Sequence, residues 1–223
     1  MSDERVLVVG TTSDYIDLIQ RRHPGRALFL TDRTHRAEAT EPAPGPRDEV
    51  LSDLSAPATV LADLERHLRE RDTRLGGITC YDCDSLSLAA ALGSALGLPY
   101  PTAAAVAACR SKYACKRLWR EAGVPCPAAQ EVTSLEEAAA FLARTWAPAV
   151  LKPLDSSGSE LAFLCRDARD LDQAYACIQA RHAAAIPGAS PITRLARLAP
   201  PAPAAPGARD RATPLPRTFV VEE

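Results

Sequence analysis

The sequence predicts an α/β protein in which a parallel, doubly wound sheet is followed by a smaller, incomplete α+β region. Three observations carry this prediction. Short apolar runs alternate with amphipathic helical segments over about residues 5–100, which is typical of a parallel sheet. Two strand-like runs near residue 155 are then joined by a loop of small residues. Aromatic residues are only 5% of the 223 residues, so the core is built mainly from Ala, Leu and Val, which suits helices packed closely against a sheet.

The first part of the chain contains four predicted strands with helices between them. The apolar run 6–9 closes at Gly10, and residues 13–22 follow with helical spacing. Further strands are expected at 27–32, 49–54 and 77–80, and helices at 59–71 and 85–96. Asp84 is expected to cap the last of these helices.

The second part changes its pattern near residue 108. Ser111 is expected to cap a helix over 112–122, which Gly123 ends. A short extended piece at 128–132 precedes Ser134, which with Glu137 forms a capping box for a helix to about residue 145.

The rest of the second part begins with a predicted hairpin. Its strands are residues 149–154 and 161–165, and the connecting loop at 155–159 is small and polar. Asp170 and Gln173 suggest a second capping box before a helix to about residue 184. Strand character returns at 218–221.

Residues 187–216 differ in composition from everything around them. They contain eight prolines, much alanine and no aromatic residue, so we expect a disordered or extended insertion. Recognition of a partner by a basic or polyproline II segment is the alternative.

Composition excludes several classes of function. The net charge of −2 and the pI near 6.1 give no basic field for a nucleic-acid backbone. The most apolar stretch, residues 86–98, is interrupted by Gly and Ser and is too short to span a bilayer, so no membrane partner is expected. The N-terminus does not read as a signal peptide, and seven cysteines, an odd number without framework spacing, favour reduced thiols in the cytoplasm.

Two lysines are the strongest candidates for binding an anion. Lys112 stands at the first position of a predicted helix, where the helix dipole disfavours a cation unless an anionic ligand is present. Lys152 lies in an apolar strand, just before the loop Ser156, Ser157, Gly158 and Ser159, whose hydroxyl and N–H groups suit a polyphosphate. The alternatives are an exposed lysine that tolerates the helix start, and a solvated lysine on an edge strand, which Pro153 would permit.

Other polar residues are expected to be structural. Neither a P-loop nor the GxGxxG fingerprint is present, which disfavours an NAD-dependent Rossmann protein. Cys80 and Cys83 have a thioredoxin-like spacing but no helix N-terminus on the first thiol, and the four histidines are scattered. Asp32 ends a strand and is expected to cap a helix or lie in a loop; facing a substrate crevice is the alternative.

An ordered series of short motifs resembles the ATP-grasp superfamily of carboxylate ligases, which includes biotin carboxylase, carbamoyl-phosphate synthetase and the amino-acid ligases. The series reads Gly97-Leu-Pro-Tyr-Pro, Arg-Ser-Lys112-Tyr, Glu-Ala-Gly-Val-Pro125, Pro-Ala-Val-Leu-Lys152-Pro-Leu-Asp-Ser-Ser-Gly-Ser and Phe-Val-Val-Glu222-Glu223. The resemblance implies a pre-ATP-grasp domain over residues 1–107 and the N-terminal half of an ATP-grasp domain over residues 108–223.

The resemblance also implies roles for individual residues. Lys112 and Lys152 match the lysines that touch the nucleotide phosphates, and Ser156, Ser157, Gly158 and Ser159 match the lid over the triphosphate. Glu222 and Glu223 match the start of the hinge strand whose backbone recognises adenine. The implied cofactors are ATP and Mg²⁺, and the implied substrates are a small-molecule carboxylate, activated as an acyl-phosphate, and an amine that attacks it.

The resemblance stops where the second half of the domain would begin. In the family that half supplies the Mg²⁺ ligands and an arginine, so the isolated chain is expected to be inactive as a ligase and to contain no metal ligands. Glu160 and Leu161 follow the lid where many relatives have glycine. An oligomer or a complementing C-terminal half is a possible partner, and a truncated or diverged protein that binds a nucleotide or a partner without catalysis is the alternative function.

Overall fold

A computed structural model describes residues 3–145, 148–154, 161–183 and 219–222 of the chain. The contacts divide the chain into two units, Met1–Ala107 and Ala108–Glu223. The predicted insertion at 187–216 lies outside the described residues, as do Ser156, Ser157, Gly158, Ser159 and Glu223.

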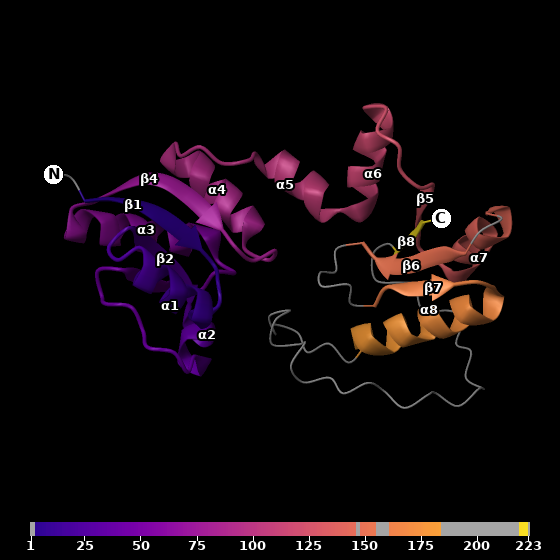
Figure 1. The fold of residues 1–223 in the computed structure, drawn as a ribbon, viewed down its shortest axis with the longest axis horizontal. Coiled ribbons are helices and arrows are strands. Elements are labelled where there is room, and N and C mark those ends of the chain that lie inside the picture. The colour runs from indigo at the N-terminus through magenta and orange to yellow at the C-terminus, as the bar shows by residue number, and fades with distance from the viewer. Residues whose placement is uncertain (1–2, 146–147, 155–160, 184–218, 223) are drawn as a thin grey trace. The chain divides into compact units, whose positions relative to one another are not determined.

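The first unit alternates strands and helices along the chain (Figure 1). Its described elements are β1 (Asp3–Val9), α1 (Ser13–Arg22), β2 (Ala27–Asp32), α2 (Arg33–Glu38), β3 (Glu49–Ser52), α3 (Pro57–Arg71), β4 (Thr73–Cys80) and α4 (Leu86–Leu96), and α5 (Ala103–Arg110) extends across the boundary between the units.

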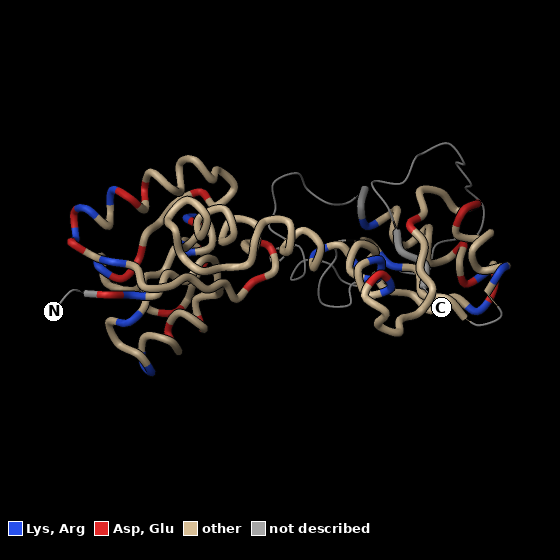
Figure 2. The backbone as a smooth tube through the Cα atoms, turned by 90° about the horizontal axis from the view of Figure 1, so that it is seen from above, with Lys and Arg blue, Asp and Glu red and all other residues tan. Residues whose placement is uncertain are grey.

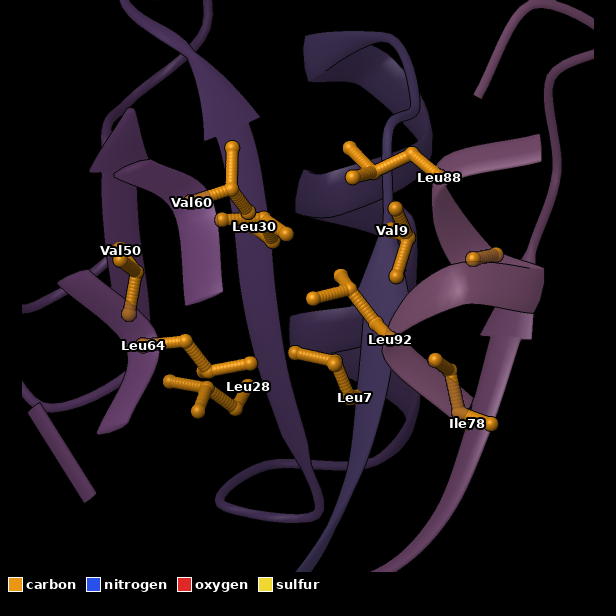
Figure 3. Packing of buried hydrophobic residues seen from close by; sticks show 11 residues of the cluster. Leu7, Val9, Leu28, Leu30, Val50, Val60, Leu64, Ile78, Leu88 and Leu92 are labelled. Carbon is orange, nitrogen blue, oxygen red and sulfur yellow. The ribbon is translucent and has the colours of Figure 1, made fainter. Parts of the chain in front are cut away.

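The strands of the first unit form one parallel sheet in the order β3-β2-β1-β4. Alternate residues of the central strands pack on opposite faces. One face packs against α3 and α4 (Figure 3), and its buried cluster is Leu7, Val9, Leu28, Leu30, Val50, Val60, Leu64, Ile78, Leu88, Ala89 and Leu92. The other face packs against α1, and its cluster is Val8, Ile16, Ala27 and Phe29. Helices on both faces of a parallel sheet confirm the doubly wound prediction.

The elements predicted for the first unit are all present, but α2 and α5 were not predicted and several bounds differ by a few residues. The strand expected at 77–80 begins earlier, at Thr73, because it runs the full length of β1. The capping role expected of Asp84 is wrong. The carboxylate of Asp82 accepts the N–H groups of Asp84 at 2.8 Å and Ser85 at 2.6 Å, and Ser85 is the N-cap residue of α4.

The second unit contains a mixed set of helices and antiparallel strands. Its described elements are α6 (Lys112–Glu121), β5 (Ala129–Val132), α7 (Leu135–Arg144), β6 (Ala149–Pro153), β7 (Phe163–Cys165), α8 (Ala168–Ala183) and β8 (Phe219–Glu222).

The strands of the second unit pair in the order β5-β8-β6-β7. β6 and β7 form the predicted hairpin, with Ala149 opposite Cys165 and Leu151 opposite Phe163. β8 lies between β5 and β6, so the last described strand is central in this sheet. One face of the sheet packs against α7 and α8, through a cluster of Val132, Ala138, Phe141, Ala149, Leu151, Cys165, Leu171, Ala174 and Ile178. The α+β prediction for this part is therefore confirmed.

The helix caps of the second unit follow from short polar side chains. Ser134 Oγ accepts the N–H of Glu137 at 3.2 Å, as predicted, while the carboxylate of Glu137 accepts the N–H of Thr133 at 2.7 Å. The box predicted at Asp170 and Gln173 is wrong. α8 begins earlier, because Asp167 accepts the N–H of Asp170 at 2.9 Å and so caps the first turn.

Charged residues of both signs are interspersed along both units (Figure 2), in keeping with the net charge of −2. None of the helices in the described part of the chain has the length and hydropathy that a membrane span requires.

Candidate functional site

Lys112 connects the start of α6 to the end of β6. Ser111 caps the helix, with its Oγ accepting the N–H of Ala114 at 3.1 Å, as the sequence predicts. The backbone N–H of Lys112 donates to the carbonyl of Leu154 at 3.3 Å, and its Nζ donates to the same oxygen at 3.2 Å. Leu154 is the last described residue before the loop 155–160, so Lys112 lies at the base of the predicted lid.

Lys152 lies in the interior of the second sheet. It pairs with Val220 of β8, and β6 is flanked by β8 on one side and β7 on the other. The edge-strand alternative for Lys152 is therefore wrong. Burial alternates along β6: Leu151 and Pro153 are buried, whereas Lys152 is half-buried and projects from the opposite face of the sheet.

Helix α6 covers part of that opposite face. Ala129 and Val150 both pair with Glu222, so the three residues lie side by side across the sheet. The next residue of β6, Leu151, is in the core against α7 and α8, so Ala129 and Val150 are on the opposite face. Ala129 is nevertheless 8% exposed, and α6 packs against its strand. Figure 1 shows α6 and α8 on opposite sides of the sheet. Lys112 and Lys152 therefore lie on one side, away from the apolar core.

The predicted lid and hinge are described only at their margins. Leu154 precedes the lid, and Leu161 follows it with a left-handed φ of 56°. Ser156, Ser157, Gly158 and Ser159 lie outside the described residues, as do Glu160 and Glu223. The backbone of Glu222 pairs with Ala129 and Val150, at the end of the central strand.

The remaining candidates have structural roles. Asp32 caps α2, accepting the N–H of Thr34 at 2.8 Å, and also accepts the N–H of Leu54 at 3.2 Å, so the helix-cap interpretation is confirmed. Cys80 and Cys83 are both free thiols, and burial raises the pKa of Cys80 to about 12, which makes it a poor nucleophile near neutral pH.

Two features of the site bear on metal and phosphate binding. The described residues contain no group of three or more His, Cys, Asp or Glu side chains that could hold a metal ion. Lys116, which is 9% exposed, was not among the residues predicted from the sequence. Its spacing of four from Lys112 was the available signal, because residues four apart share one face of a helix.

Comparison with known proteins gives structural matches over most of the chain but no match to a protein-family model. None of the protein-family models matches the amino-acid sequence. Over 74 residues the chain is 40% identical to the uncharacterized protein y4rH of Sinorhizobium fredii, a match that covers 33% of this chain and 16% of that protein.

Solved structures resemble the chain over most or all of its length. The L-amino acid ligase from Bacillus licheniformis matches 100% of this chain at a TM-score of 0.61 and 14% identity, over 44% of the ligase. N5-carboxyaminoimidazole synthetase from Staphylococcus aureus, complexed with ADP, matches 98% of this chain at a TM-score of 0.58 and 10% identity. The match covers 47% of the synthetase. The biotin carboxylase domain of 2-oxoglutarate carboxylase from Hydrogenobacter thermophilus, in complex with MgADP and bicarbonate, matches 77% of this chain at a TM-score of 0.54 and 17% identity. The match covers 40% of that structure. The chain thus spans less than half the length of each of these structures.

Proposed function

We propose that this chain, which has the fold of the N-terminal portion of ATP-grasp enzymes, is the ATP-binding portion of a ligase that activates a carboxylate as an acyl-phosphate for attack by an amine. The observation that supports it most is the contact of Lys112 with Leu154, which brings the start of α6 to the end of the strand carrying Lys152. Two cations then flank the base of a loop rich in small polar residues.

The proposed roles follow from charge and backbone geometry. Lys112 and Lys152 neutralise the phosphates, because a phosphate oxygen near an ammonium forms a strong charge-assisted hydrogen bond. Ser156, Ser157, Gly158 and Ser159 cover the triphosphate with hydroxyl and N–H donors. Glu222 ends the central strand, and the backbone groups of Glu222 and Glu223 are assigned to the recognition of adenine.

The proposal assigns no metal ligand to the described residues. Mg²⁺ would accompany the nucleotide and neutralise charge on its phosphates. The small-molecule carboxylate and amine are of the classes named for the structural neighbours, such as amino acids and bicarbonate.

Equilibrium binding of ATP to the wild type and to Lys112→Ala and Lys152→Ala tests the proposal. Each substitution removes one charge-assisted contact and is expected to weaken binding about tenfold or more. Arg144→Ala is the matched control, because Arg144 contacts Gln130 and Phe141 and is not part of the proposed site.

Two outcomes would contradict the proposal. If the wild type does not bind ATP, there is no nucleotide site in this chain. If it binds ATP with an affinity that ignores both lysines, the site lies elsewhere and the chain is better described as an interaction module.

A further inference from the structure

Two cysteines lie at the connection between β4 and α4. Cys80 is the last residue of β4, and Cys83 lies in the bend at residues 82–85 that precedes α4. Both are free thiols, and Cys80 is half-buried whereas Cys83 is exposed. The carboxylate of Asp82 accepts two N–H groups of the bend, at 2.8 Å and 2.6 Å. The segment that separates the two thiols is therefore short and held by a side chain of its own.

A hydrogen bond directs the Cys80 thiol at the peptide group that precedes Cys83. The Sγ of Cys80 donates to the carbonyl oxygen of Asp82 at 3.1 Å. In a trans peptide this oxygen is about 2.8 Å from the next Cα, which here belongs to Cys83. The Cys80 sulfur is therefore within about 6 Å of the Cys83 Cα. Rotation of the exposed Cys83 side chain, with a small adjustment of the loop, can bring the two sulfur atoms to the bonding distance of about 2 Å.

The surroundings of Cys80 favour a disulfide over the free dithiol. Burial, and then the negative charge of Asp82, raise the pKa of Cys80 to about 12. Strongly oxidising thiol pairs owe their high potentials to a reduced form that a thiolate stabilises. At neutral pH the reduced form gains no such stabilisation from Cys80, so the disulfide resists reduction once it has formed.

We propose that Cys80 and Cys83 form a reversible disulfide, with a low-molecular-weight disulfide such as oxidised glutathione as the oxidant. The Cys83 thiolate attacks one sulfur of oxidised glutathione, and one glutathione thiolate leaves. The Cys80 thiol then gives up its proton and attacks the Cys83 sulfur, and the second glutathione thiolate leaves. Two cysteine thiols are oxidised, and one glutathione disulfide is reduced to two thiols, which take up the two protons.

The disulfide changes contacts at the corner where β1 and β4 both end. Val9 and Cys80 pair at the ends of these strands. Oxidation removes the thiol proton that the Asp82 carbonyl accepts. Asp82 holds the start of α4 through its carboxylate and lies against Gly10, at the end of β1. The redox state of the pair therefore acts on the loop beside Gly10, and this inference is independent of the proposed function.

Equilibration of the native chain in glutathione buffers, followed by alkylation and fragmentation mass spectrometry of its peptides, tests the proposal. Cys80 and Cys83 are expected to lose one hydrogen atom each and to resist alkylation, and dithiothreitol is expected to restore both thiols. Cys109, which is also exposed, is the control and is expected to form at most a mixed disulfide with glutathione. A lasting mixed disulfide at Cys83 beside a Cys80 thiol would overturn the proposal. So would a bridge to Cys109, or an unreacted pair in oxidised glutathione alone.

Comparison of the native with the denatured chain separates the effect of the fold from that of sequence spacing. Two cysteines three positions apart form some disulfide even in an unfolded chain. The equilibrium constant for the disulfide between Cys80 and Cys83, measured against glutathione, is expected to be about tenfold or more higher in the native chain, because the bend holds the Cys80 thiol close to Cys83. A native constant equal to or below the denatured one would show that the fold does not bring the two thiols together.

Substitution tests the order of the two steps. Cys80→Ser is expected to accumulate the mixed disulfide of Cys83 with glutathione, because the second step has no thiol. Cys83→Ser is expected to leave Cys80 reduced, because this thiol is half-buried and its pKa is raised. Rapid reaction of Cys80 with glutathione disulfide in Cys83→Ser would contradict the proposed order. If either variant does not fold, the measurements on the wild-type chain still decide whether the disulfide forms.

Discussion

Arg5 is a charged residue in the middle of a buried strand, and its partners explain how the strand accommodates it. It is 6% exposed, and its guanidinium donates to the carboxylate of Asp48 at 2.5 Å and to the carbonyl of Arg47 at 3.0 Å. These bonds attach the segment before β3 to β1. The ion pair is therefore a structural contact of the first unit.

We predict that Arg5→Met lowers the free energy of unfolding by about 2 kcal/mol. The loss is smaller than for a fully buried pair, because the Asp48 side chain is 29% exposed and water can replace the guanidinium. Denaturant unfolding measures the change. Arg21→Met, which breaks an exposed pair with Asp17, should change stability by less than about 0.5 kcal/mol. Equal effects of the two substitutions would contradict this account of Arg5.

Asp63 gives the first unit a defined dependence on pH. A hydrogen bond from Ser52 at 2.8 Å, and then one from Arg66 at 2.6 Å, hold the pKa of its carboxyl below the ordinary value of 3.8. A carboxyl with a lowered pKa in the folded state stabilises the protein above the unfolded value, and this contribution is lost as the pH falls through the folded value.

Ser52→Ala is accordingly expected to be less stable than the wild type at pH 6, with a difference that narrows as the pH falls below about 4. Thermal unfolding at a series of pH values measures both proteins. A difference that stays constant from pH 6 to pH 3 would show that Ser52 acts through packing and not through the charge of Asp63.

Single residues were predictable where local chemistry decides their role. Ser111 and Asp32 cap helices, because a short polar side chain at a helix start satisfies free N–H groups whatever surrounds it. The N-cap positions predicted for Asp84 and Asp170 were wrong, because the carboxylates of Asp82 and Asp167, each a few residues earlier, accept the N–H groups instead. Asp170 holds the second position of its box and accepts the N–H of Arg166 at 3.0 Å. When two carboxylates lie within a few residues of a helix start, the sequence does not show which of them caps the helix, because that depends on the path of the backbone.

At the scale of elements, Gly10 sets the connection between β1 and α1. It has a left-handed φ of 56°, and a Cβ placed on it would lie 2.1 Å from Ser85 Oγ and 2.2 Å from an Asp82 carboxylate oxygen. Gly25 shares the left-handed conformation, with a φ of 71°, but a Cβ there would meet nothing within 4 Å.

Gly10→Ala is predicted to destabilise the chain more than Gly25→Ala does. The second substitution adds only backbone strain, about 1 kcal/mol, while the first adds the displacement of the segment that starts α4, for a total of about 3 kcal/mol. Chemical denaturation gives the free energy of unfolding of the two variants, and the difference between them separates the steric clash at residue 10 from the backbone strain that both share. A Gly10→Ala variant no less stable than Gly25→Ala would mean that the α4 segment moves aside without cost.

Elements with strong periodicity were predicted well, and those without it were missed. The ranges 13–22 and 27–32 agree with α1 and β2, because each element has an apolar pattern facing the core. α2 has no buried residue, so no pattern marks it. α5 is rich in alanine but buries only Val106, and it has no distinct apolar face.

At the scale of the whole molecule, the order of strands could be inferred only where neighbours in sequence also pair in space. The parallel sheet of the first unit follows from alternating strands and helices. In the second unit, β8 pairs with β5 and β6, from which many residues separate it in the sequence, and no local pattern encodes that insertion. The pairing brings Glu222 beside Val150, and it also excludes Lys152 from a sheet edge.

The residues of the candidate site could be predicted from the sequence, but the contacts between them could not. Lys112 and Lys152 were identified from their positions in a helix and a strand. The bond from Lys112 to Leu154, and the burial of Lys116 on the same face of α6, depend on how α6 packs on the sheet. Packing of that kind is a tertiary property that spacing alone does not determine.

The central claim is that this chain binds a nucleotide through its phosphates. The most direct test is the ratio of the dissociation constants of adenosine and ATP for the wild-type chain, measured by calorimetry in the same buffer. Two charge-assisted contacts predict that ATP binds about a hundredfold more tightly than adenosine. Equal affinities, or no binding of ATP, would contradict the claim.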